Sequence, residues 1–120
     1  MTREELLSLF EELGALQTGH FQLTSGLHSG QYVQCAAVFE YPKIAGKIVE
    51  QLVGQLPTDI DTIIAPAIGG INLGYEAARS LGCRFIFTER EDGVMTLRRG
   101  FVLKPGEKVL VVEDVVTTGG

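Results

Sequence analysis

Three short apolar runs, separated by longer connections, most constrain the fold of this chain. The runs are DTIIAP at residues 61–66, CRFIFTE at residues 83–89 and VLVV at residues 109–112. Between the first two lies YEAARSLG, which predicts a helix that ends at Gly82. Buried strands that alternate with helical crossovers are typical of an α/β protein. The sequence therefore predicts a parallel central sheet flanked by helices.

Two further helices are predicted in the first half of the chain. Thr2-Arg3-Glu4-Glu5 forms a capping box that begins the first helix, and Gly14 ends it. Pro42 begins the second helix, in which apolar residues recur every four positions. We expect these residues to face the core, together with the apolar residues beside them: Ile44, Ile48, Leu52 and Leu56, with Ala45, Val49 and Val53. The glycine-rich segment at residues 19–30 predicts short strands and loops between the two helices.

The region after the second predicted strand is charged. Residues 90–93, REDG, predict a loop. MTLRRGFVL at residues 95–103 predicts a hairpin, and a turn at Lys104-Pro105-Gly106-Glu107 precedes the last apolar run.

The composition limits the classes of protein to which this chain can belong. Of the 120 residues, 45% are apolar and 21% are charged, which is typical of a globular chain rather than a disordered one. The net charge of −5 argues against nucleic-acid binding, which normally needs a basic face. No stretch approaches the roughly 20 apolar residues of a membrane span, and the N-terminus does not resemble a signal peptide. We therefore expect a cytoplasmic protein that contacts neither nucleic acid nor membrane.

The cysteines and histidines give weaker indications. Cys35 and Cys83 are far apart and not in a CxxC arrangement, so they indicate reduced core thiols rather than a disulfide or a metal site. His20 and His28 lack any metal-ligand spacing. They indicate loop or surface histidines, with contacts to a bound base as the alternative.

The chain ends on VLVVEDVVTTGG, in which an apolar strand leads into an acid pair and then into small residues. Glu113 and Asp114 can accept hydrogen bonds from vicinal hydroxyls or from metal-bound water. Residues 117–120 offer hydroxyls and main-chain amides that suit a phosphate, above all if a helix follows. The alternative is a buried strand that ends in a solvated acidic turn. The whole pattern favours a site for a phosphorylated ribose.

These residues resemble the phosphoribosyl-pyrophosphate (PRPP) motif of type I phosphoribosyltransferases. HFQLTSGLHSGQYVQ, APAIGGINLGYEAARSLG and FTEREDGVMTLRRGF are similar to segments of the orotate phosphoribosyltransferases within that family. The resemblance implies the type I phosphoribosyltransferase fold in a single, incomplete domain. Residues 1 to about 40 would form the N-terminal helix and a base-binding hood. Residues 41–120 would form the core sheet, with a flexible loop near residues 89–100.

The resemblance also implies a role for each segment. Glu113 and Asp114 would hold the ribose hydroxyls, and the residues after them would wrap the 5-phosphate. The PRPP-binding residues would be Glu113, Asp114, Val115, Val116, Thr117, Thr118, Gly119 and Gly120. The pyrophosphate loop would be Ala67, Ile68, Gly69 and Gly70. Orotate would contact Thr117, Ser25 and Tyr32, although packing of Tyr32 under the N-terminal segment is an equal alternative.

Lysines that many family members carry are absent from this chain. Thr24 precedes the Ser-Gly of the N-terminal segment, and Gly69 stands in the pyrophosphate loop. The expected mobile loop also has no lysine, and Arg90 is the candidate catalytic cation there. Arg98 and Arg99 are either further phosphate ligands or surface charges of a hairpin.

The resemblance implies transfer of the 5-phosphoribosyl group from PRPP to orotate, which gives orotidine 5′-monophosphate and pyrophosphate in pyrimidine (UMP) biosynthesis. It further implies a homodimer, and Mg²⁺ bound mainly through PRPP without a direct protein ligand. The rival interpretations are a non-catalytic regulator that binds PRPP and a phosphoribosyltransferase for a purine or uracil. We expect the chain to be cut within the PRPP motif and inactive by itself, because no helix follows the phosphate-binding turn.

Overall fold

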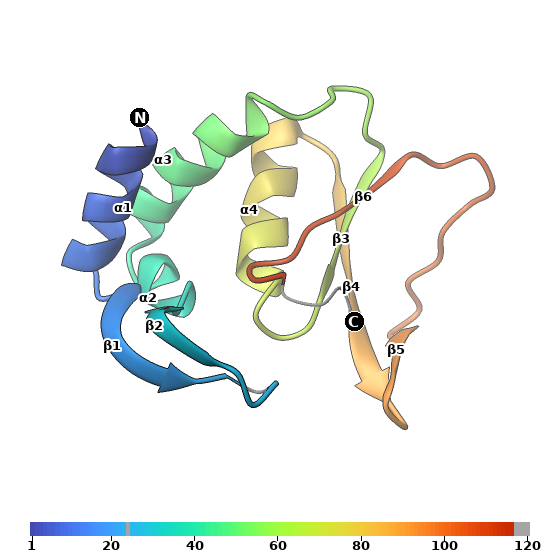
Figure 1. Cartoon of the computed structure of the whole chain (residues 1–120). Helices are drawn as coiled ribbons and strands as arrows, with labels where there is room; N and C mark the ends of the chain where they lie inside the picture. The colour runs from blue at the N-terminus through green and yellow to red at the C-terminus, as the bar shows by residue number, and fades with distance from the viewer. Residues whose placement is uncertain (24, 117–120) are drawn as a thin grey trace. The chain divides into compact units, whose positions relative to one another are not determined.

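The computed structural model describes residues 1–23 and 25–116 (Figure 1). It divides into two compact units, Met1–Ala45 and Gly46–Gly120, which are described one at a time. The helices are α1 (Arg3–Glu12), α2 (Ala36–Phe39), α3 (Pro42–Val53) and α4 (Ile71–Leu81). The strands are β1 (Leu16–Gln22), β2 (His28–Val33), β3 (Thr62–Pro66), β4 (Arg84–Glu91), β5 (Val94–Leu97) and β6 (Val109–Val111). Among the described residues, no helix has the length and apolar character needed to cross a membrane.

The first unit contains α1 and an antiparallel ribbon of β1 and β2. The predicted helix cap is present, since Oγ1 of Thr2 accepts a hydrogen bond from the main-chain N–H of Glu5 at 3.1 Å. The ribbon occupies the glycine-rich segment, so the short strands predicted there pair with each other. Their pairing is irregular between Thr18 and Phe21, where one strand bulges.

The helices after the ribbon differ in detail from the prediction. The sequence did not predict α2, because four residues are too few to show a helical period. α3 begins at Pro42 as predicted but ends before Leu56. Ala45 and Val49 are buried in α3, whereas Leu52 is 41% exposed. The buried residues of this helix therefore belong to the predicted core-facing stripe, whereas Leu52 of the same stripe is exposed.

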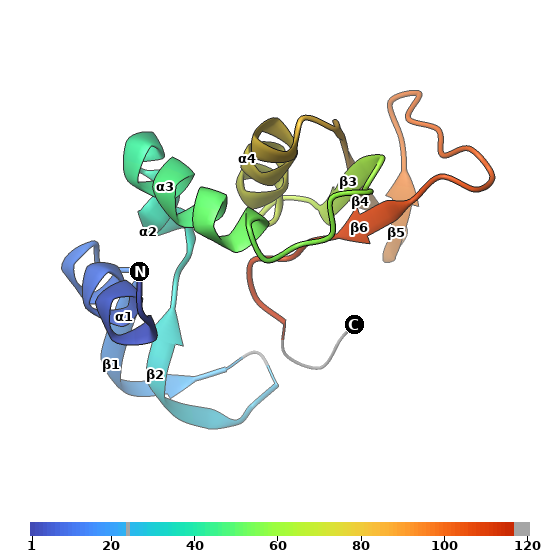
Figure 2. The same cartoon turned by 90° about the horizontal axis from the view of Figure 1, so that it is seen from above.

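The second unit holds a four-stranded sheet in the order β5-β4-β3-β6 (Figure 2). β3 pairs in parallel with both β4 and β6, whereas β5 pairs antiparallel with β4 at one edge. The predicted parallel central sheet is confirmed, with one antiparallel strand added. Ile63 and Ala65 on the central strand β3 are completely buried.

α4 covers one face of this sheet and approaches it most closely at Gly74 (Figure 1). A Cβ atom placed on Gly74 would lie 2.5 Å from Cε1 of Phe85 and 3.0 Å from Cβ of Ala65. No side chain fits in that space, so glycine is what lets the helix pack against β3 and β4. Gly82, with a φ of 76°, ends the helix as predicted.

The hairpin that joins β4 to β5 is displaced from its predicted position. β4 extends to Glu91, and the chain reverses through Asp92 and Gly93, which have φ values of 51° and 79°. Two successive positive φ values are typical of the type I′ turn that Asp-Gly favours in two-residue hairpins. The loop predicted at residues 90–93 is therefore largely strand and turn, and residues 94–97 form the second strand of the hairpin.

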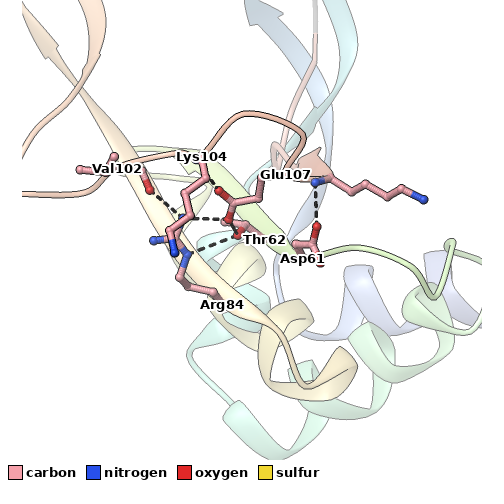
Figure 3. Close-up of polar contacts among 7 residues, drawn as sticks. Asp61, Thr62, Arg84, Val102, Lys104 and Glu107 are labelled. Atoms are coloured by element: carbon pink, nitrogen blue, oxygen red, sulfur yellow. Dashed lines mark hydrogen bonds and ion pairs between the residues drawn. The ribbon is translucent and has the colours of Figure 1, made fainter.

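A polar network at the amino ends of β3 and β4 holds the segment that leads into β6 (Figure 3). Nη2 of Arg84 donates to the Val102 carbonyl at 2.8 Å and to Oε1 of Glu107 at 2.9 Å. The Thr62 hydroxyl donates to the same Glu107 oxygen, and the Lys104 N–H donates to Oε2 at 2.8 Å. These donors hold the charged form of Glu107 in place at the start of the sheet.

The next residue along the chain fixes the beginning of β6. The main-chain N–H of Lys108 donates to Oδ2 of Asp61 at 2.9 Å, and the Lys108 carbonyl accepts from the N–H of Asp61 at 2.8 Å. β6 therefore enters the sheet in parallel register with β3, with Thr62 opposite Val109.

Candidate functional site

The carboxyl ends of β3 and β6 bring two of the predicted segments together. In an open parallel sheet, ligands bind outside the carboxyl ends of the strands. β3 leads into a turn at residues 67–70 and then into α4, whereas β6 leads into the acid pair. The N–H of Val112 donates to the Ile64 carbonyl at 2.9 Å, which continues the pairing of the two strands beyond β6. The acid pair therefore follows directly beside the turn.

The turn at residues 67–70 is exposed at Ile68 and Gly69. The Ala67 N–H donates to the Thr88 carbonyl at 2.7 Å, which ties the turn to β4, and the Ala67–Ile68 peptide bond is cis. Ile68 is 85% exposed. Among the described residues, the N–H groups of Ile68 and Gly69 donate no hydrogen bond. Two such amides immediately before the N-terminus of α4 suit an anion.

Gly69 of the turn lies close to Asp114 of the acid pair. A Cβ atom placed on Gly69 would lie 2.8 Å from Oδ2 and 3.0 Å from Oδ1 of Asp114. The carboxylate thus lies against the main chain of the turn. The sequence placed both residues in a site but gave no sign of this contact, because it depends on the register of β6 against β3.

The acid pair is half-buried, and this environment acts on the Glu113 carboxyl. Burial raises the pKa of Glu113 above its usual value, and the neighbouring Asp114 carboxyl raises it further. The N–H of Asp114 donates to Oε1 of Glu113 at 3.1 Å, which opposes this rise. Adjacent carboxyls in such a setting can accept hydrogen bonds from a diol or bind a hydrated divalent cation.

The remaining residues of the predicted PRPP motif are only partly described. Val115 and Val116 follow the acid pair and are exposed. Thr117, Thr118, Gly119 and Gly120 lie outside the described residues.

Two of the residues predicted to contact orotate, Ser25 and Tyr32, belong to the first unit and are described only within it, whereas the third, Thr117, lies outside the described residues. Oγ of Ser25 accepts a hydrogen bond from the N–H of Leu27 at 3.4 Å. The Tyr32 ring packs 5.6 Å from the ring of Phe21, centroid to centroid, and Tyr32 is 39% exposed. Tyr32 therefore has a packing contact in the ribbon as well as an exposed surface.

The ribbon also joins two histidines that the sequence treated as separate. Nε2 of His20 and Nδ1 of His28 lie 2.6 Å apart across β1 and β2. Both are exposed, and the bulge before Phe21 sets which residues of the two strands face each other. A register prediction for the ribbon would have found this pair, but the glycines in the segment leave the register open.

The three candidate arginines are all engaged near the β4–β5 hairpin. Nη1 of Arg90 donates to the Gly93 carbonyl at 3.0 Å. Arg99 forms a two-pronged pair with Glu89, at 2.7 and 2.9 Å, and its guanidinium lies 5.7 Å from the centre of the Phe87 ring. The hydrogen bonds from Arg99 lower the pKa of Glu89.

Arg98 is held less closely than its neighbour, since its Nε lies 3.7 Å from Oε2 of Glu91. The side chains of Arg98 and Arg99 are 49% and 61% exposed, so water screens both pairs. All three arginines can leave these partners for an anion at modest cost.

Comparison with known proteins identifies the class to which this sheet and site belong. Residues 36–120 match the sequence profile of the phosphoribosyl transferase domain. The chain is 54% identical over 121 aligned positions to the orotate phosphoribosyltransferase of Desulforamulus reducens. That alignment covers 100% of this chain and 63% of the relative, so the chain spans less than two thirds of that protein's length. The chain belongs to the phosphoribosyl transferase domain family.

Solved structures support the fold. The orotate phosphoribosyltransferase of Aeropyrum pernix superposes with a TM-score of 0.76 at 24% identity, covering 95% of this chain and 67% of that one. The adenine phosphoribosyl transferase of Trypanosoma brucei superposes with a TM-score of 0.68 at 18% identity, covering 100% of this chain and 59% of that one. The type I phosphoribosyltransferase fold is therefore shared between proteins named for different bases, and the fold alone does not select the base.

Proposed function

We propose that the chain carries the PRPP-binding core of an orotate phosphoribosyltransferase, which transfers the 5-phosphoribosyl group of PRPP to orotate. The products are orotidine 5′-monophosphate and pyrophosphate, in the synthesis of UMP. The observation that carries the proposal is the proximity of the Asp114 carboxylate to Gly69, because a Cβ atom placed on Gly69 would lie 2.8 Å from Oδ2 of Asp114. A carboxylate that can bind a diol, beside a turn that can bind an anion, supports a site for a phosphorylated ribose.

The choice of orotate rests on sequence rather than on fold. The relative from Desulforamulus reducens is named for orotate and aligns over the whole chain at 54% identity. The adenine enzyme with the same fold is only 18% identical. Orotate is therefore favoured over a purine as the acceptor.

The chemistry needs positioning and charge stabilisation rather than a covalent nucleophile. Substitution at the anomeric carbon builds positive charge on the sugar while negative charge grows on the departing pyrophosphate. Glu113 and Asp114 would orient the ribose through its two hydroxyls and lie near the cationic sugar. The N–H groups of Ile68 and Gly69 would receive pyrophosphate oxygens. Arg90 would move from the Gly93 carbonyl to the departing group.

A divalent cation fits this arrangement. Carboxylate oxygens are the ligands that Mg²⁺ prefers, and Glu113 with Asp114 supplies them beside the turn. Within the described residues, no group of three or more histidines, cysteines or acids could hold a metal by itself. As the resemblance implies, Mg²⁺ would be bound mainly through PRPP oxygens and would neutralise charge on the pyrophosphate. A homodimer and a cytoplasmic location remain predictions from the sequence.

Orotate-dependent release of pyrophosphate tests the proposal. The full-length protein, incubated with PRPP and Mg²⁺, should release pyrophosphate when orotate is added and should release little with adenine or uracil. PRPP binding without turnover on any base would favour the regulator interpretation instead. Turnover on adenine or uracil in preference to orotate would overturn the choice of acceptor.

A further inference from the structure

The Glu89 side chain points to the face of the sheet that α4 covers. Side chains alternate between the two faces along a strand, so Phe85, Phe87 and Glu89 of β4 share one face. The Phe85 ring makes an edge contact with the ring of Tyr75 in α4, with 6.1 Å between their centroids. The rings of Phe85 and Phe87 stack at 6.3 Å. Glu89 continues this row towards the carboxyl end of β4.

Along the sheet, Glu89 is level with the turn at residues 67–70. Pro66 pairs with Thr88, and the Ala67 N–H donates to the Thr88 carbonyl at 2.7 Å. Glu89 is the next residue of β4, and neighbouring strands lie about 4.8 Å apart. The Glu89 carboxylate therefore lies beside the turn that suits an anion, on the face of the sheet towards which the turn leads.

Arg99 is held at this place by Glu89. Its Nε and Nη2 donate to Oε2 and Oε1 of Glu89, at 2.7 and 2.9 Å, and its guanidinium lies 5.7 Å from the centre of the Phe87 ring. The Arg99 side chain is 61% exposed. Water competes for such an exposed guanidinium, so the ion pair holds Arg99 only weakly. Arg99 can therefore exchange Glu89 for another anion beside the turn.

We propose that Glu89 competes with the pyrophosphate group of PRPP for Arg99: it holds the guanidinium before PRPP binds and gives it up to phosphate oxygens. This inference rests on the proposed function. Carboxylate and phosphate both accept two parallel hydrogen bonds from a guanidinium, so either group fits the same fork of donors. PRPP must then break the Glu89–Arg99 pair before it can use Arg99, which lowers its apparent affinity.

The affinity for PRPP in the full-length protein tests this competition. Titration calorimetry with PRPP and Mg²⁺ compares the unmodified protein with Glu89→Gln. The variant lacks the charged partner of Arg99, so its affinity for PRPP should rise about threefold or more. Damage to the fold would lower the affinity, so a rise distinguishes a competitor from a purely structural residue. Unchanged or weaker binding by Glu89→Gln would overturn the inference.

Glu91→Gln is the matched control for the loss of one negative charge. Glu91 also lies on β4, but Oε2 of Glu91 is 3.7 Å from Nε of Arg98, and its side chain is 53% exposed. This variant removes the same charge without releasing a closely held arginine. Its affinity for PRPP should therefore rise much less than that of Glu89→Gln. An equal rise in the two variants would mean that net charge alone is responsible, which would also overturn the inference.

The Nε–H resonance of Arg99 reports the exchange of partners directly. In NMR spectra of the unmodified protein this resonance, identified by its absence from Arg99→Lys, should shift when PRPP and Mg²⁺ are added. In Glu89→Gln the same N–H should exchange faster with water before any ligand is added. An Arg99 resonance that stays unchanged at saturating PRPP would overturn the inference while the proposed function stands. If the unmodified protein does not bind PRPP at all, the proposed function falls and the inference falls with it.

Discussion

Nη2 of Arg84 lies 2.9 Å from Oε1 of Glu107, and this pair joins the start of β4 to the segment before β6 (Figure 3). The pair lies at the amino ends of the strands, whereas the candidate site lies at their carboxyl ends. Because β6 pairs with β3 over few residues, contacts before the strand help to fix its register. The register of β6 against β3 in turn brings Asp114 close to Gly69.

Because of Glu107, the stability of the protein should change with pH in the acid range. Hydrogen bonds from the Thr62 hydroxyl and the Lys104 N–H, then the Arg84 guanidinium, lower the pKa of Glu107 from 4.5 to about 2. Since the folded-state pKa is the lower one, this stabilisation is complete above about pH 4.5 and is lost as the pH falls towards 2. Glu107→Gln should therefore be less stable than the unmodified protein at pH 7, with a difference that shrinks below pH 4.5.

Thermal unfolding from pH 7 to pH 2 measures this difference. Glu11→Gln, at an exposed position in α1, serves as the control for the loss of one carboxyl charge and should change the melting temperature little at pH 7. A constant gap between Glu107→Gln and the unmodified protein over the whole range would contradict the assignment.

Thr62 is completely buried, and its hydroxyl both donates to Glu107 and accepts from Nε of Arg84 at 3.3 Å. Thr62→Val keeps the shape of the side chain but removes both hydrogen bonds. Glu107 and Arg84 would each lose one hydrogen bond while their charges stay in place. The free energy of unfolding should therefore fall by about 1–3 kcal/mol. Urea denaturation at pH 7 measures the change. Thr18→Val at an exposed position of β1 should change it by less than about 0.5 kcal/mol, and equal effects would refute the role of the network.

The sequence predicted the sheet well because its central strand is mostly buried, with Thr62, Ile63 and Ala65 completely inaccessible to water. Strands that are covered on both faces have continuous apolar runs, and the run at residues 61–66 became the central strand β3. The β4–β5 hairpin was misplaced although Asp92-Gly93 is a strong turn signal. The charged residues around it suggested a loop, but Arg90 and Glu91 lie where β4 extends beyond its pairing with β3 and pairs only with the edge strand β5, and charge is compatible with a strand there.

The candidate site was predicted in its parts but not in its geometry. The acid pair and the glycines of the turn stood out because their chemistry is local to each segment. Gly69 and Asp114 are far apart in the chain. Their proximity depends on the register of β6 against β3 and on the exact positions of the atoms. No local pattern in the sequence carries that information.

Asp114 should be needed for binding rather than for folding. Asp114→Asn keeps the shape of the side chain but removes a charge-assisted hydrogen bond to the ribose, worth about 1.5–3 kcal/mol. The affinity for PRPP should fall about tenfold or more, and the melting temperature should change little. Titration calorimetry with PRPP and Mg²⁺ measures the affinity. Unaltered binding by Asp114→Asn would remove this residue from the site.

Arg90, Arg98 and Arg99 should differ when each is replaced by alanine in the full-length protein. Arg90→Ala loses a hydrogen bond to a main-chain carbonyl, so its effect on stability should be small. If Arg90 stabilises the departing pyrophosphate, kcat should fall more than the affinity for PRPP.

Arg99→Ala loses both bonds to Glu89 and the contact with the Phe87 ring, so it should lower the melting temperature more than Arg90→Ala does. Arg98→Ala, which loses only a 3.7 Å ion pair, is the matched control. Steady-state kinetics with orotate, together with thermal unfolding, separates these cases. Equal and mild effects of all three variants on kcat would show that none of these arginines serves the leaving group.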